Sequence, residues 1–69
     1  MLHQKLDRAS FAMALTIHRD RLNITQAEAA EIIDVSARKY WQMEKKERDT
    51  SHAEQIGALE LLKFARVKK

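Results

Sequence analysis

The sequence predicts an all-α fold, a small bundle of four helices. Three observations predict this class. The chain contains one glycine and no proline, so the residues that most often interrupt helices are nearly absent. Strong helix formers dominate, and no segment alternates β-branched with polar residues as a strand does. At 69 residues we expect a single domain over residues 1–69, with a five-helix bundle as the alternative architecture.

The first helix is expected from near Leu6 to Arg21. One apolar stripe with i, i+4, i+7 and i+11 spacing runs along it and is interrupted by a histidine; its members are Phe11, Leu15, His18 and Leu22. We expect the histidine to replace a core aliphatic residue and its polar nitrogen to find a local partner.

The second helix has a clear start at Thr25. Thr25 and Glu28 have the spacing of a capping box, in which the hydroxyl and the carboxylate each accept a backbone N–H of the other residue. We expect the helix to end near Ile32. Asp34 follows it, and aspartate tolerates the backbone geometry of tight turns.

The third helix is expected from Ala37 to about Lys45, with Ser36 as its N-cap. Tyr40 and Met43 are spaced to face inward. Ala29 and Ala30 in the second helix are small enough to let the third approach closely. Together the two short helices form a predicted helix-turn-helix over about residues 25–46. The polar segment from Lys45 to Thr50 is expected to be a loop.

The fourth helix is expected over about residues 52–66, after a second capping box at Ser51 and Glu54. Its apolar residues point in nearly every direction, which favours burial on more than one side. We therefore expect a homodimer through this helix, with five residues at its interface: Ile56, Leu59, Leu61, Leu62 and Phe64. The alternative is a one-sided helix with a few exposed apolar residues.

The outward face of the third helix has the chemistry to read DNA bases. Tyr40 and Met43 point inward, so the opposite face is polar and basic. Arginine can bond guanine O6 and N7, glutamine can bond adenine N6 and N7, and alanine can touch a thymine methyl group. Trp41 is expected on this groove side, and its alternative roles are the edge of the core, a phosphate contact through its indole N–H, or a stacking surface. The expected base-reading residues are Ser36, Ala37, Arg38, Trp41 and Gln42.

Basic residues flank this face where phosphates would lie, namely Lys39, Lys45, Lys46 and Arg48. Such contacts add affinity that depends on salt but not on sequence. The formal net charge of +3 is compatible with a nucleic-acid partner. The alternative is an ordinary solvated basic face.

The stretch ITQAEAAEIIDVSARKYWQMEKK resembles the helix-turn-helix of Cro/C1-type (XRE-like) repressors. The resemblance covers about 28 residues, from Arg19 to Lys46. The positions that carry it are Thr25, Gln26, Ala29, Ala30, Val35, Ser36, Met43 and Glu44. Asp34 and Lys46 stand where the family often has glycine. The family usually adds two helices after the reading helix, whereas this chain has room for about one.

The resemblance implies a lambda-repressor-like fold and a function. Gln26 would contact a phosphate, and Arg19 would pair with Glu44 to fix the first helix against the third. The protein would be a transcriptional repressor that binds double-stranded operator DNA, an inverted repeat, as a dimer and controls its own operon. Small phage and mobile-element autorepressors, including anti-CRISPR-associated regulators, are similar in size and in their long last helix.

Other classes have less support. There is no cysteine, and His3, His18 and His52 lack the spacing of a metal site, so we expect no metal, no cofactor and no enzyme. No apolar run is long enough for a membrane span. We expect a cytoplasmic protein of a bacterial host or a phage. Two alternatives stay open: an antitoxin-type DNA-binding protein that also binds a toxin, and a helical protein-interaction module without DNA readout.

Overall fold

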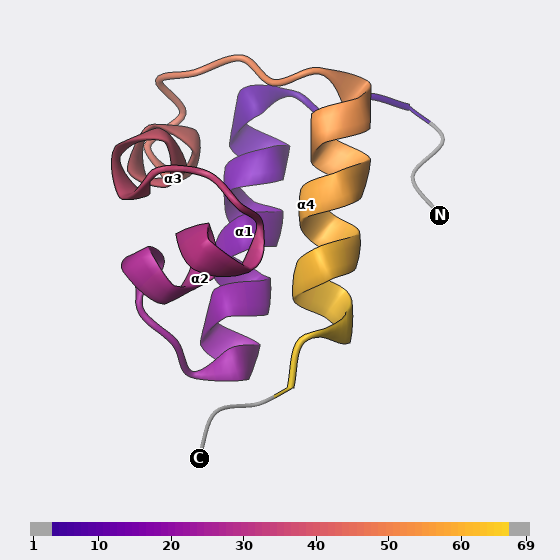
Figure 1. The fold of residues 1–69 in the computed structure, drawn as a ribbon. Helices are drawn as coiled ribbons and strands as arrows, with labels where there is room; N and C mark the ends of the chain where they lie inside the picture. The colour runs from indigo at the N-terminus through magenta and orange to yellow at the C-terminus, as the bar shows by residue number, and fades with distance from the viewer. Residues whose placement is uncertain (1–3, 67–69) are drawn as a thin grey trace.

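The computed structural model of the chain describes residues 4–66, and this range contains four α-helices and no strand. α1 (Arg8–Leu22) and α4 (His52–Phe64) run side by side in the same direction, as Figure 1 shows. α2 (Gln26–Ile32) and α3 (Ala37–Glu44) pack on one side of this pair. The expected all-α four-helix fold is therefore confirmed.

α1 is bounded by a polar cap at each end. The Asp7 carboxylate accepts the Ser10 backbone N–H at 2.7 Å, so the helix begins after Asp7 and not near Leu6. Asn23 ends it in the left-handed region with φ 57° and ψ 49°, and its N–H bonds the Asp20 carbonyl at 3.1 Å. Asparagine adopts this conformation more readily than most residues do.

Both expected capping boxes are formed. The Thr25 N–H bonds the Glu28 carboxylate at 2.9 Å, and the Ser51 N–H bonds the Glu54 carboxylate at 3.0 Å. The hydroxyl of Ser36 accepts the Lys39 N–H at 3.0 Å and caps α3 as expected. Each cap binds one of the N–H groups that a helix start leaves without an intrahelical partner.

Two helices end slightly earlier than expected. α3 ends at Glu44, one residue before Lys45. α4 ends at Phe64 and not near Arg66, because Ala65 takes extended backbone geometry with ψ 147°. Within the described part of the chain, no helix is both long and apolar enough to cross a bilayer.

The core lies where α2 and α3 meet the α1–α4 pair. Ala29 and Ala30 are buried at the contact of α2 with α3, as their small size predicts. Buried side chains from all four helices and the α2–α3 turn form one cluster: Phe11, Leu15, Leu22, Ala29, Ala30, Ile33, Tyr40, Met43, Ala58 and Leu62. Because Tyr40 and Met43 of α3 belong to this cluster, it fixes which side of α3 faces the core.

His18 departs from expectation in one respect. It is half-buried on α1, but its Nδ1 atom is buried without a hydrogen-bond partner, so the expected local partner is not found. Burial lowers the pKa of this imidazole, and the nearby charges of Arg21 and Lys63 lower it further. The neutral form is therefore favoured at this position.

The turn between α2 and α3 contains a residue with positive φ. Asp34 has φ 59°, a conformation that costs most residues about 1 kcal/mol or more and glycine nothing. We expect Asp34→Gly to raise the free energy of unfolding by about 0.5–1 kcal/mol and Asp34→Val to lower it by about 2 kcal/mol, measured by urea denaturation. A valine variant as stable as the parent would contradict this conformation.

Candidate nucleic-acid interface

The outward face of α3 is the side of the helix opposite its two buried side chains. Tyr40 is fully buried and Met43 nearly so. The opposite side of the helix carries Arg38 and Lys45, both exposed. Trp41 is 40% exposed on this side of the helix and is not among the residues that pack against the core cluster. This face is open to a partner over its whole length.

The remaining expected base-reading residues also lie on accessible parts of α3 and its cap. Ser36 and Ala37 are exposed at the start of the helix, and Gln42 is half-buried near its end. Among residues 4–66, Arg38 forms no hydrogen bond or ion pair, so its guanidinium is available to a ligand. The structure therefore gathers the expected set on one side of one helix.

An ion pair ties α3 to α1 on the inward side. Arg19 and Glu44 form the pair that the resemblance implies, with Nε to Oε2 at 2.9 Å and Nη2 to Oε1 at 3.1 Å. Only 22% of the Arg19 side chain and 6% of the Glu44 side chain are exposed. Two hydrogen bonds between the same guanidinium and carboxylate fix the relative orientation of the two side chains as well as their separation.

Gln26 completes this junction at the start of α2. Its Nε2 donates to Glu44 Oε1 at 3.0 Å. Burial would raise the pKa of Glu44, but hydrogen bonds from Arg19 and Gln26, together with the neighbouring Tyr40 hydroxyl, lower it below the ordinary value. Gln26 thus has a structural role that the sequence did not indicate.

Tyr40 lies beneath the same junction. Burial raises the pKa of its phenol, and the adjacent Glu44 carboxylate raises it further. The hydroxyl meets no partner at hydrogen-bond geometry, which is unusual for a buried polar atom. The ring therefore contributes through packing, and it keeps α3 in a fixed rotation about its axis.

The basic side chains that we expect to contact phosphate differ in the contacts that they make within the protein. Lys45 lies over the Trp41 ring at 5.9 Å, and Arg48 donates to Gln42 Oε1 at 3.1 Å. Lys46 is exposed and has φ 65°, so it occupies the left-handed position that glycine often takes after a helix. These three cations lie around the C-terminal end of the outward face of α3.

Lys39 is the least available of the expected phosphate contacts. It is half-buried, and its Nζ bonds Glu54 Oε2 at 3.0 Å. Glu54 also accepts the Ser51 N–H in the capping box, and these bonds lower its pKa to about 2. Any anion that binds this lysine would have to compete with the Glu54 carboxylate.

The expected dimer interface divides into three groups. Leu62 is fully buried in the core of the subunit, so it cannot contact a partner and its assignment was wrong. Ile56 and Leu59 are half-buried. Leu61 and Phe64 are 50% and 75% exposed, and these two residues are available for association.

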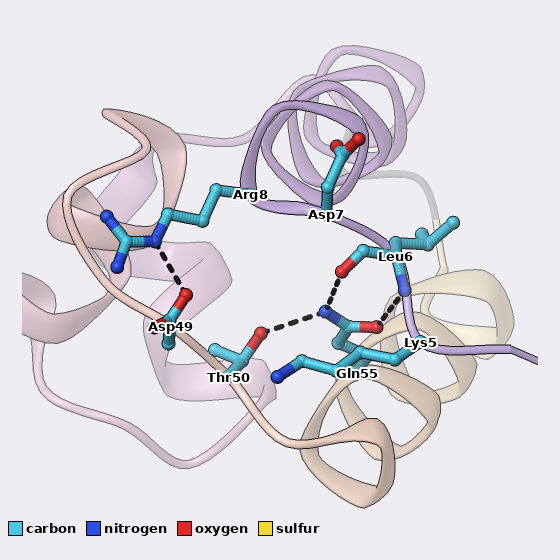
Figure 2. A pocket seen from close by; sticks show the side chains of 7 residues that line it. All are labelled: Lys5, Leu6, Asp7, Arg8, Asp49, Thr50 and Gln55. Carbon is cyan, nitrogen blue, oxygen red and sulfur yellow. Dashed lines mark hydrogen bonds and ion pairs between the residues drawn. The ribbon is translucent and has the colours of Figure 1, made fainter.

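A buried glutamine joins the N-terminal segment to α4, and the sequence analysis missed it. Gln55 Oε1 accepts the Leu6 N–H at 2.7 Å, and its Nε2 donates to the Leu6 carbonyl at 2.9 Å and to Thr50 Oγ1 at 3.1 Å. Figure 2 shows Gln55 between these two residues. A signal was present, because Gln55 lies on the inward stripe of α4 with Ala58 and Leu62.

The same junction borders a hollow of about 350 Å³, lined by seven residues: Lys5, Leu6, Asp7, Arg8, Asp49, Thr50 and Gln55. Arg8 Nε pairs with Asp49 at 2.6 Å across it (Figure 2). This ion pair and the hydrogen bonds of Gln55 join the N-terminal segment to the loop after α3.

Metal ligation receives no geometric support in the part of the chain that the structure describes. No group of three or more histidine, aspartate or glutamate residues within 4–66 is placed to hold a metal ion. His3, one of the three histidines considered from the sequence, lies outside the described residues.

Comparison of the chain with protein-family models, with curated proteins and with solved structures finds no match. The likeness to Cro/C1-type repressors therefore rests on the residues from Arg19 to Lys46.

Proposed function

We propose that this protein is a sequence-specific, double-stranded DNA-binding transcriptional repressor that places α3 in the major groove. One observation carries the proposal. The outward face of α3 presents Arg38, Trp41, Gln42 and Lys45 and no carboxylate, on a helix packed firmly from behind. An α-helix fits the major groove, and exposed arginine and glutamine side chains are common readers of base edges.

Phosphate contacts would come from both sides of α3. Lys46 and Arg48 follow its end, and Gln26 lies at the start of α2 with one amide hydrogen uncommitted. Such contacts set register on the duplex and supply most of the salt-dependent affinity. Lys39 contributes less, because Glu54 holds it.

Dimerisation would place two reading helices on an inverted repeat, about 34 Å apart in successive major grooves. Exposed apolar side chains at Leu61 and Phe64 support a self-association surface at the end of α4. A small domain also gains stability from a second subunit. From the resemblance we extend the proposal to repression of the protein's own operon in the bacterial cytoplasm.

Binding to a random-sequence duplex tests the electrostatic part of the proposal. Lys46→Ala removes one expected phosphate contact, so the slope of log affinity against log salt should fall by about one. Fluorescence anisotropy over a series of salt concentrations measures both slopes. Lys63→Ala on α4 makes the same charge change away from α3 and should leave the slope unchanged. Equal slopes for the Lys46 variant and the parent would remove Lys46 from the phosphate contacts.

The association surface has its own test. Leu61→Glu places a charge on an exposed apolar position, so sedimentation should show monomers where the parent shows dimers. Ala9→Glu adds the same charge at an exposed position on α1 and should leave the dimer intact. A Leu61 variant that sediments as a dimer would refute this location of the interface.

A further inference from the structure

The hydrogen bond between Arg48 and Gln42 fixes which atom of the Gln42 amide faces which way. Arg48 Nη1 lies 3.1 Å from Gln42 Oε1. A guanidinium has no acceptor, so the amide oxygen and not the nitrogen must face Arg48. The nitrogen, a donor, is the part of Gln42 left for a base.

This orientation changes what Gln42 can recognise. Glutamine pairs with adenine by donating to N7 and accepting from N6, which requires the oxygen and the nitrogen together at the base edge. The oxygen keeps a second lone pair, but it is directed at Arg48, so the amide is not oriented for this two-point pairing with adenine. A base that offers only acceptors requires only the amide nitrogen.

The neighbouring groups on the outward face are also donors. Arg38 and Lys45 are cations without acceptor atoms, and the indole of Trp41 has only an N–H to offer. The Ser36 hydroxyl oxygen accepts the Lys39 N–H at 3.0 Å, which uses one of its two lone pairs, and its hydroxyl hydrogen remains to donate. The one carboxylate of α3, on Glu44, is turned inward and bonded to Arg19 and Gln26.

We propose that this donor face selects base edges that present only acceptors, foremost guanine with N7 and O6, and that Arg48 determines this specificity by orienting Gln42. Thymine O4 is the second edge of this kind, whereas adenine and cytosine present an amino donor in the major groove. The inference rests on the proposed function, since it concerns the same α3 face. Arg48 acts here as a positioning residue for Gln42, in addition to its charge.

The test begins with the duplex that the parent protein enriches from a random pool. Gln42→Ala identifies the base pair that Gln42 reads, because preference is lost at that position. Duplexes that differ only there, with guanine or adenine, are then titrated with the parent and with Arg48→Ala. We expect the parent to favour guanine about tenfold and Arg48→Ala to bring the two bases close to parity, since the released amide can pair with adenine.

Lys46→Ala is the matched control, because it removes a nearby cation that bonds no reading residue. It should weaken binding to both duplexes equally. Arg48 is exposed in a loop, and circular dichroism checks that its variant is folded. A parent that prefers adenine or cytosine at the Gln42 position, or an unchanged preference in Arg48→Ala, would overturn the inference and leave the proposed function standing. Failure to enrich any sequence would overturn both.

Discussion

Replacing Arg19 with alanine is expected to lower the free energy of unfolding by about 3 kcal/mol. The substitution leaves the Glu44 carboxylate, of which 6% is exposed, with Gln26 as its remaining side-chain donor. Removing one partner of a buried pair costs more than the pair itself contributes, because the other charge stays buried. A domain of this length has about 3–10 kcal/mol in all, so the variant should be close to unfolding.

Urea denaturation measures the loss, and two further variants calibrate it. Arg19→Lys keeps the charge but not the bidentate bond, so we expect an intermediate loss of about 1–2 kcal/mol. Arg38→Ala removes an exposed arginine without a partner in the described range and should change stability by less than about 0.5 kcal/mol. Equal stability of the Arg19 and Arg38 alanine variants would mean that the ion pair does not fix α1 against α3.

The same pair has a pH signature. Because the pKa of Glu44 is lower in the folded protein than its ordinary value of 4.5, the pair contributes fully above that pH. The contribution falls as the pH drops from 4.5 through the lowered pKa. Arg19→Ala should therefore flatten the acid limb of the stability curve.

Replacing Gln55 with methionine is expected to cost about 3 kcal/mol. Methionine keeps the length of the side chain but removes three hydrogen bonds, to Leu6 N–H, the Leu6 carbonyl and Thr50. Each buried group left without a partner costs about 1–3 kcal/mol, and water entering from the adjoining hollow recovers a part.

Two measurements separate this junction from general packing. Denaturation gives the loss of stability, and hydrogen exchange of the Leu6 amide should accelerate beyond what that loss explains, because its acceptor is gone. Glu60→Met makes a similar change at an exposed position of α4 and should have little effect. Slow exchange at Leu6 in the Gln55 variant would show that Gln55 does not hold the N-terminal segment.

The helix starts could be predicted from the sequence because their causes are local. Thr25, Ser36 and Ser51 each bind a backbone N–H three residues away. The inward direction of Tyr40 and Met43 also follows from helical spacing, and with it the outward face of α3. The pairing of Arg19 with Glu44 spans 25 residues, and only the resemblance pointed to it.

What could not be predicted depends on contacts between distant segments. Gln55 meets Leu6 across 49 positions, and Lys39 meets Glu54 across 15. Amphipathic patterning says which side of a helix is buried, but not which polar atoms meet there. For this reason Lys39 was expected to be free although it is paired. Leu62 was placed at a surface although it lies in the core, because the apolar residues of α4 point in nearly every direction and the pattern does not single out the buried side.

The most direct test of the central claim is selection of bound sequences from a random pool of duplex DNA, with the parent protein and with Arg38→Ala. We predict that the parent enriches an inverted repeat whose half-sites lie about one helical turn apart, and that Arg38→Ala loses the preference at one position in each half-site. A pool that stays random with the parent, or an Arg38 variant that enriches the same bases at every position, would contradict the reading of DNA by α3.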